Sequence, residues 1–132
     1  MSPSEGSSGG VSIVRLDEDV PQIDVGPGVE VRHLVGQELM FRVVELAADA
    51  SLPIDEPDQE HAVFVTAGTV RIAQGERDWE VASESAAMLR VGRGFSLAAV
   101  GGAARCHIAS TPPNVALVRD LLHLEHADHG FD

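Results

Sequence analysis

The chain has 132 residues, and 44% of them are hydrophobic, which is enough for the core of one domain. Its formal net charge is −12, with 21 acidic residues against nine basic ones, so we expect no nucleic-acid partner because the chain repels phosphate. No apolar run approaches the roughly 18 residues of a membrane span, so we expect no membrane partner either.

Residues 1–10 are small and mostly polar, and they predict a disordered tail. They have neither the basic start nor the apolar stretch of a secretory signal, so a cytoplasmic location is the default expectation. Cys106 is the only cysteine. It can form neither an internal disulfide nor a Cys-rich zinc site, and we expect it to be a small buried apolar residue.

Residues 11–113 predict many short strands separated by turn residues, which is typical of an all-β sandwich or barrel. The expected elements in chain order are an arm or first strand at 11–23, strands at 29–35 and 39–47, an acidic loop at 49–60, two strands around the Ala67-Gly68 turn, and further strands at 77–83, 86–100 and 103–110. The loop carries two prolines and five acids, so it reads as a solvated connection.

Residues 114–132 differ from the rest because they follow Pro112-Pro113, which stops a strand. Asn114 is suited to cap a helix. The apolar residues that follow share one helical face: Leu117, Val118, Leu121 and Leu122. We therefore expect one short C-terminal helix that packs on the barrel or on a partner subunit.

Two sets of positions repeat the spacing of a known pair of motifs, although most signature residues differ. The first set is Asp49, Asp55, Pro57, His61 and Gly68, and the second is Ala86, Gly92, Gly94, Leu97 and Gly101. With these positions, the stretch from about Gly28 to Pro113 resembles a small single-domain cupin. The resemblance implies a double-stranded β-helix, or jelly-roll barrel.

Cupins typically hold Fe, Mn, Zn or Ni with three histidines and one glutamate that face into the barrel. By resemblance, the corresponding positions here are Asp55, Pro57, His61 and Leu97. Pro57 and Leu97 have no ligand atoms, and two remaining ligands rarely hold a transition metal. We therefore expect no metal and no other cofactor. One alternative stays open, an unusual metal site built from Asp55, His61 and a histidine such as His107.

His61 is the first candidate for chemistry. If the resemblance holds, its side chain faces into the barrel beside Val63 and Val65. A histidine in an apolar pocket has a tunable pKa and can act as a general acid or base. The alternative is a partly buried histidine whose ring nitrogens are hydrogen-bonded and which has a structural role.

Arg42 is the second candidate. Alternation places it on one face of its strand with Met40, Val44 and Leu46. A guanidinium inside a barrel needs a carboxylate or an anionic ligand to offset its desolvation, and Asp55 or Glu56 could supply that carboxylate. The alternative is a strand buried on both faces, with Arg42 reaching the barrel rim.

These residues predict a metal-independent enzyme that acts by proton transfer on a small, partly apolar molecule. His61 would be the acid or base, Asp55 would orient it, and Arg42 would hold an anionic group. The expected lining of the substrate site is Met40, Val44, Val63, Val65, Leu97 and His107. By resemblance to small cupins of bacterial secondary metabolism, the reaction would be an isomerisation, dehydration or cyclisation.

A second hypothesis is a binding or sensing module that performs no chemistry. The C-terminal helix and an open barrel edge would then serve dimerisation. Small cupins commonly pair, so the resemblance also implies a homodimer. Trp79, the lone tryptophan, is expected to anchor either the barrel or the dimer.

Overall fold

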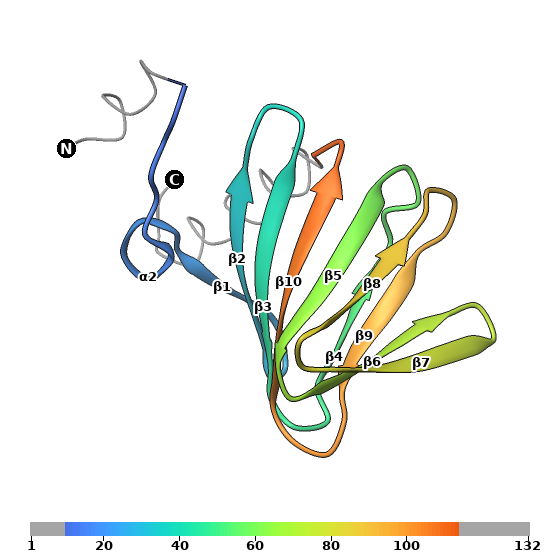
Figure 1. Cartoon of the computed structure of the whole chain (residues 1–132). Helices are drawn as coiled ribbons and strands as arrows, with labels where there is room; N and C mark the ends of the chain where they lie inside the picture. Colours follow the sequence, from blue (N-terminus) through green and yellow to red (C-terminus); the bar gives the residue numbers. More distant parts are fainter. Residues whose placement is uncertain (1–9, 114–132) are drawn as a thin grey trace, which may run out of the picture.

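The computed structural model describes residues 10–113, which form ten strands in two antiparallel sheets (Figure 1). The predicted helix at 114–132 and nearly all of the predicted tail at 1–10 lie outside the described residues. Within residues 10–113, no helix is long and apolar enough to cross a membrane. The all-β jelly-roll architecture predicted from the sequence is confirmed.

A single helical turn, α2 (Leu16–Asp19), precedes the strands. The strands are β1 (Gln22–Gly26), β2 (Val29–Val35), β3 (Met40–Leu46), β4 (Ser51–Ile54), β5 (Glu60–Ala67), β6 (Thr69–Gln74), β7 (Arg77–Ala82), β8 (Ser85–Leu89), β9 (Phe95–Ala99) and β10 (Ala104–Thr111). The larger sheet, here called sheet A, has the order β1-β2-β3-β10-β5-β8, and sheet B has the order β4-β9-β6-β7.

Most strands lie where the sequence places them, because alternation and turn residues determine them locally. β2 spans the predicted 29–35, and β5 and β6 flank the turn at Gly68. The predicted loop at 49–60 is wrong in its first half, which forms β4. Pro53 lies within this strand, and a proline is tolerated there because β4 is an edge strand of sheet B.

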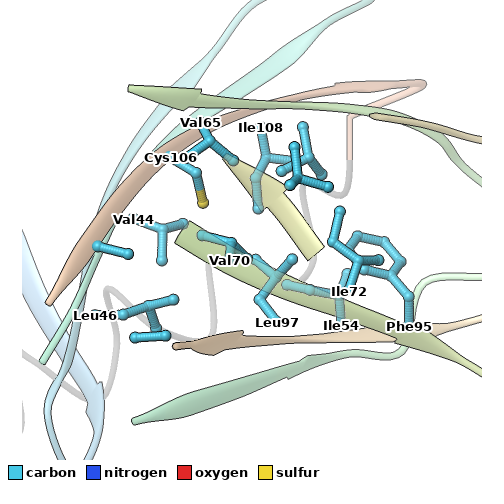
Figure 2. Close-up of a cluster of buried hydrophobic side chains, with 14 of the residues drawn as sticks. Val44, Leu46, Ile54, Val65, Val70, Ile72, Phe95, Leu97, Cys106 and Ile108 are labelled. Carbon is cyan, nitrogen blue, oxygen red and sulfur yellow. The ribbon is translucent and has the colours of Figure 1, made fainter. Parts of the chain in front are cut away.

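The space between the two sheets is filled with apolar side chains (Figure 2). From sheet A, one row of opposed inward residues is Val31, Val44, Cys106 and Val65, which the strand register places side by side. Ile72 and Leu97 of sheet B pack against this cluster and are almost fully buried. The barrel therefore has a close-packed interior over most of its length, and polar side chains enter it only at one end.

Candidate functional site

Strand β3 carries the first polar side chain into the barrel. Met40, Arg42, Val44 and Leu46 are at most 2% exposed and alternate along the strand. On the opposite face Val43 is buried, Phe41 is partly buried and Glu45 is exposed. The inner face is therefore the buried one, and Arg42 lies on it rather than in solvent at the rim.

The guanidinium of Arg42 is neutralised by Glu56, which follows β4 in the chain. Arg42 Nη1 donates to Glu56 Oε2 at 2.9 Å, and Arg42 Nη2 donates to Glu56 Oε1 at 2.8 Å. Nη2 also donates to the hydroxyl of Ser110 at 2.9 Å. Both side chains of the ion pair are buried, so this bidentate geometry offsets the desolvation of two charges.

His61 of β5 completes the group, and the network determines its tautomer. Its Nε2 lies 3.2 Å from the carbonyl oxygen of Glu56, which can only accept, so Nε2 carries the proton. Its Nδ1 lies 2.7 Å from Ser110 Oγ and accepts the hydroxyl proton. Phe95 packs edge-on against the ring with centroids 5.0 Å apart. We call Arg42, Glu56, His61 and Ser110 the polar cluster.

Two histidines at this end of the barrel are held neutral. Burial lowers the pKa of His61, and the charge of Arg42 lowers it further, whereas the hydrogen bond to the Glu56 carbonyl opposes the shift. His33, opposite Arg42 in the strand register, has its pKa lowered to about 4, mainly by burial and then by Arg42. At neutral pH His61 is therefore a neutral proton acceptor.

Asp55 does not hold the position predicted for it. It is exposed, and the neighbouring Glu56 enters the barrel in its place. Consecutive residues of an extended chain point in opposite directions, so only one of the two acids can face the interior. The carboxylate of Glu56 binds Arg42, and it is the carbonyl of Glu56 that contacts His61.

His107 also departs from its prediction as a lining residue. Cys106 faces the interior, so His107 lies on the outer face of sheet A. There it is half-buried, and its ring packs edge-on against Phe41 with centroids 5.2 Å apart. The alternative metal site that included His107 is inconsistent with this placement.

The predicted apolar lining is buried but does not surround an open cavity. Met40, Val44, Val63, Val65 and Leu97 are each fully buried. Except for Met40, they belong to the packed apolar core.

Among the hollows found in residues 10–113, one of about 260 Å³ adjoins the polar cluster, because Glu56 is part of its lining. Its lining includes the buried Glu56 and Gln59 and the exposed Asp55, Asp58 and Pro112. The segment 55–59 supplies most of this lining, and His61 is not part of it. A larger hollow of about 500 Å³, lined partly by Glu30, Glu45 and Arg105, shares no residue with the polar cluster.

The donors at this end do not fit the ion that cupins typically hold. Residues 10–113 contain no group of three or more His, Cys, Asp or Glu side chains placed to hold a metal. The Glu56 carboxylate is bound to Arg42, whose positive charge would oppose a cation there. Leu97 is buried and offers no ligand atom, while Pro57 is exposed.

Sequence reasoning missed one member of the cluster, Ser110, and left the choice between Asp55 and Glu56 open. Ser110 was detectable, since alternation from the buried Cys106 through Ile108 reaches it on the inner face of β10. Glu56 was named as one of two acids able to pair with Arg42, but no periodicity within the loop distinguishes it from Asp55. Gln59, which is also buried and donates to the carbonyl of Pro112, had no signal.

Solved structures with the same arrangement of strands are numerous, at low sequence identity. KdgF from Halomonas sp. superposes with a TM-score of 0.71 and 16% identity, covering 80% of this chain and 99% of that one. The polyketide cyclase RemF from Streptomyces resistomycificus superposes with a TM-score of 0.65 and 17% identity, covering 78% of this chain and 80% of that one. A sugar phosphate isomerase of the cupin superfamily from Silicibacter pomeroyi gives 0.64 and 16%, covering 76% of each chain.

No family model and no curated protein matches the sequence. The comparisons with solved structures therefore show the fold: the chain has the cupin fold. Cupin folds serve both enzymes and binding proteins, and the fold does not choose between them.

Proposed function

We propose that this cupin-fold chain is an enzyme that acts without a bound metal on a small, partly apolar molecule by proton transfer. One observation carries the proposal: the 2.7 Å contact between His61 Nδ1 and Ser110 Oγ inside the barrel, beside Arg42. A neutral imidazole and a positive guanidinium in one buried place are suited to removing a proton from a bound anion.

The roles follow from which atoms each group offers. His61 Nδ1 accepts the proton through Ser110, whose hydroxyl gives its own proton to Nδ1 as its oxygen takes the proton of the substrate. Arg42 is the site for a substrate carboxylate or phenolate, with Glu56 replacing Asp55 as its internal partner. In this state the Glu56 carboxylate occupies the place that a substrate anion would take.

Substrate entry requires the segment 55–59 to move. Its strongest bonds are those of Glu56 to Arg42 and His61, which a substrate anion would have to replace. Besides these, Gly92 N–H donates to the Pro57 carbonyl at 2.7 Å, and the Gln59 side chain donates to Pro112. The segment lines the hollow of about 260 Å³. Displacement of this segment by a ligand would join the hollow to the polar cluster, which supports a small rather than an extended substrate.

Proton transfer can be tested without knowing the overall reaction. We would incubate the protein in D₂O with a panel of small 2-oxo carboxylates and hydroxyphenyl ketones and follow deuterium incorporation by proton NMR. The wild type is expected to exchange at least one compound, and His61→Ala to lose at least about 10²-fold of that rate. His107→Ala, which removes a histidine from the outer face, is the matched control and should retain it.

A second candidate is a binding protein that performs no chemistry, and the saturation of the polar cluster favours it. Both ring nitrogens of His61 and both terminal nitrogens of Arg42 already have partners within the chain. Such a closed network is also what a structural ion pair looks like. No exchange with any compound, or equal rates in wild type and His61→Ala, would reject the enzyme and leave this candidate.

A further inference from the structure

The hollow of about 260 Å³ beside the polar cluster is lined by groups that accept hydrogen bonds. Its walls are the segment 55–59 together with Pro112 and Pro113. Three of these residues are prolines, which have no backbone N–H to donate. None of them is a lysine, an arginine or a histidine. The walls therefore favour a ligand that donates hydrogen bonds over one that accepts them.

Two of the carboxylates at this hollow have no basic partner. The Glu56 carboxylate is bound to Arg42. The exposed Asp55 and Asp58, in contrast, belong to none of the ion pairs found in residues 10–113. With 21 acidic residues against nine basic ones, the chain has few cations of its own to place there. The hollow therefore carries negative charge that a cationic group of a ligand would balance.

Gln59 adds a buried acceptor to these two carboxylates. Its side chain is 4% exposed, and its Nε2 donates to the carbonyl oxygen of Pro112. A carbonyl oxygen can only accept, so this bond determines the orientation of the amide and leaves Oε1 as its other end. Oε1 is buried, and no group in the described part of the chain donates to it. An unpaired buried acceptor destabilises the protein, so a ligand that brings an N–H donor to this wall is favoured.

The chemistry of these acceptors suits an ammonium group better than a metal ion. Residues 10–113 place no three His, Cys, Asp or Glu side chains around one point, whereas Ca²⁺ takes about six to eight oxygen ligands. A primary ammonium group has three N–H donors, and Asp55, Asp58 and Gln59 supply one acceptor group for each. A neutral hydroxyl would leave the charge of the two carboxylates unbalanced.

We propose that this hollow is the subsite for a primary ammonium group of the substrate, which makes the substrate a small amino carboxylate. Glu56 connects the two charged groups, because it lines the hollow and its carboxylate is bound to Arg42. An anion that replaced Glu56 on Arg42 would lie beside the hollow, with the ammonium group next to Asp55, Asp58 and Gln59. This substrate class rests on the proposed function, whereas ammonium binding in the hollow does not.

The size of the hollow limits the ligand further. Its volume of about 260 Å³ lies just below the roughly 300–1,000 Å³ of sites that hold drug-sized molecules. It therefore suits an ammonium group on a short chain and not a bulky amine. The rings of Pro57 and Pro112 in the wall give the methylene groups of that chain an apolar surface.

Ammonium binding is tested by titrating the full chain with propylammonium chloride and following the backbone amides by NMR. Amides within 55–59 should shift saturably, and sodium chloride or 1-propanol at the same concentrations should not cause this shift. Asp55→Asn combined with Asp58→Asn should weaken the Kd at least about tenfold, since charge-assisted hydrogen bonds are lost. Glu76→Gln combined with Asp78→Asn removes the same charge from the exposed β6–β7 hairpin, and it should leave the Kd unchanged.

Three outcomes would overturn the ammonium subsite. They are equal shifts with sodium chloride, shifts of similar size at the acidic turn α2, and a Kd that the combined substitution of Asp55 and Asp58 leaves unchanged. Each would show that the chain attracts cations only through its overall negative charge.

The substrate class is tested with 3-aminopropanoate, 4-aminobutanoate and 5-aminopentanoate beside the same carboxylates without the amine. At least one amino carboxylate should bind at least about tenfold more tightly than propylammonium and than its parent acid, because its two charged groups bind together. It should shift the amides of His61 and Ser110 as well as those of 55–59. No gain for any chain length would overturn the substrate class.

Deuterium exchange separates this result from the proposed function. An amino carboxylate that binds with both charged groups but exchanges no proton in D₂O would reject proton transfer and leave the ammonium subsite in place. Exchange by compounds that carry no amine, at rates equal to those of their amino counterparts, would support proton transfer and reject the amino carboxylate as the substrate class.

Discussion

Arg42 and Glu56 lie 14 residues apart in the chain and meet inside the barrel through two parallel hydrogen bonds of 2.9 and 2.8 Å. They close the polar end of an otherwise apolar interior. Because the pair is buried, removing either partner leaves an uncompensated charge away from water.

We therefore predict that Arg42→Met and Glu56→Leu each lower the free energy of unfolding by about 3–5 kcal/mol. The double variant should lose less than the two single losses combined, with a coupling energy of about 2 kcal/mol or more. Urea denaturation of the four proteins measures the cycle. Additive losses would mean that the two charges do not depend on one another.

Much of the fold follows from patterns that act over a few residues. Alternation in 40–46 placed Arg42 on the inner face, and the glycine at 68 marked the turn between β5 and β6. These features are readable because the strand period of two and the conformational preference of glycine are local properties. Resemblance then supplied the two-sheet arrangement.

The details of the site depended on contacts that no local pattern contains. Asp55 and Glu56 are adjacent acids in a loop, and only the position of Arg42 across the barrel determines which of them enters. The absence of an open cavity at Leu97 and Val63 likewise results from packing between two sheets. Sequence could name the inward residues, but not whether space remained between them.

Stability should fall as the pH is lowered from about 6.5 toward 4. The pKa of His33 is about 4 in the folded chain against 6.5 ordinarily, and that of His61 is also lowered. Above about pH 6.5 these two histidines are neutral in the folded and in the unfolded chain, so their titration does not reduce the free energy of unfolding. Between the two values the unfolded chain binds protons that the folded chain does not, which favours unfolding.

Urea unfolding at pH 7.5 and 5.5 tests this dependence above the range in which most carboxylates titrate. The midpoint should be lower at pH 5.5, and His33→Gln should reduce the difference between the two conditions. Greater stability at pH 5.5 in the wild type would contradict the neutral, buried state of both rings.

Cys106 should be inert in the folded protein. Its side chain is fully buried in the core, and burial raises the pKa of the thiol to about 12. Only the thiolate attacks disulfides at a useful rate. Ellman's reagent at pH 8 should therefore leave native protein unmodified and titrate one thiol after guanidinium denaturation. Rapid modification of the native chain would show that the inner face of β10 is accessible.

Gly68 and Gly101 allow the cost of backbone conformation to be separated from the cost of close packing. Both have φ of +75°, which disfavours any side chain. A Cβ at Gly101 would meet nothing within 4 Å, whereas one at Gly68 would lie 2.5 Å from the carbonyl oxygen of Ala103. The turn at 68 passes directly against the start of β10, and that backbone cannot move aside without disturbing sheet A.

Gly101→Ala should therefore cost about 1 kcal/mol from its conformation alone. Gly68→Ala should cost a further 1–3 kcal/mol, since the clash forces the β5–β6 turn away from β10. Urea denaturation of the two variants beside wild type gives both values. Equal losses would show that the turn at 68 relaxes freely, and that its glycine is required only for its positive φ.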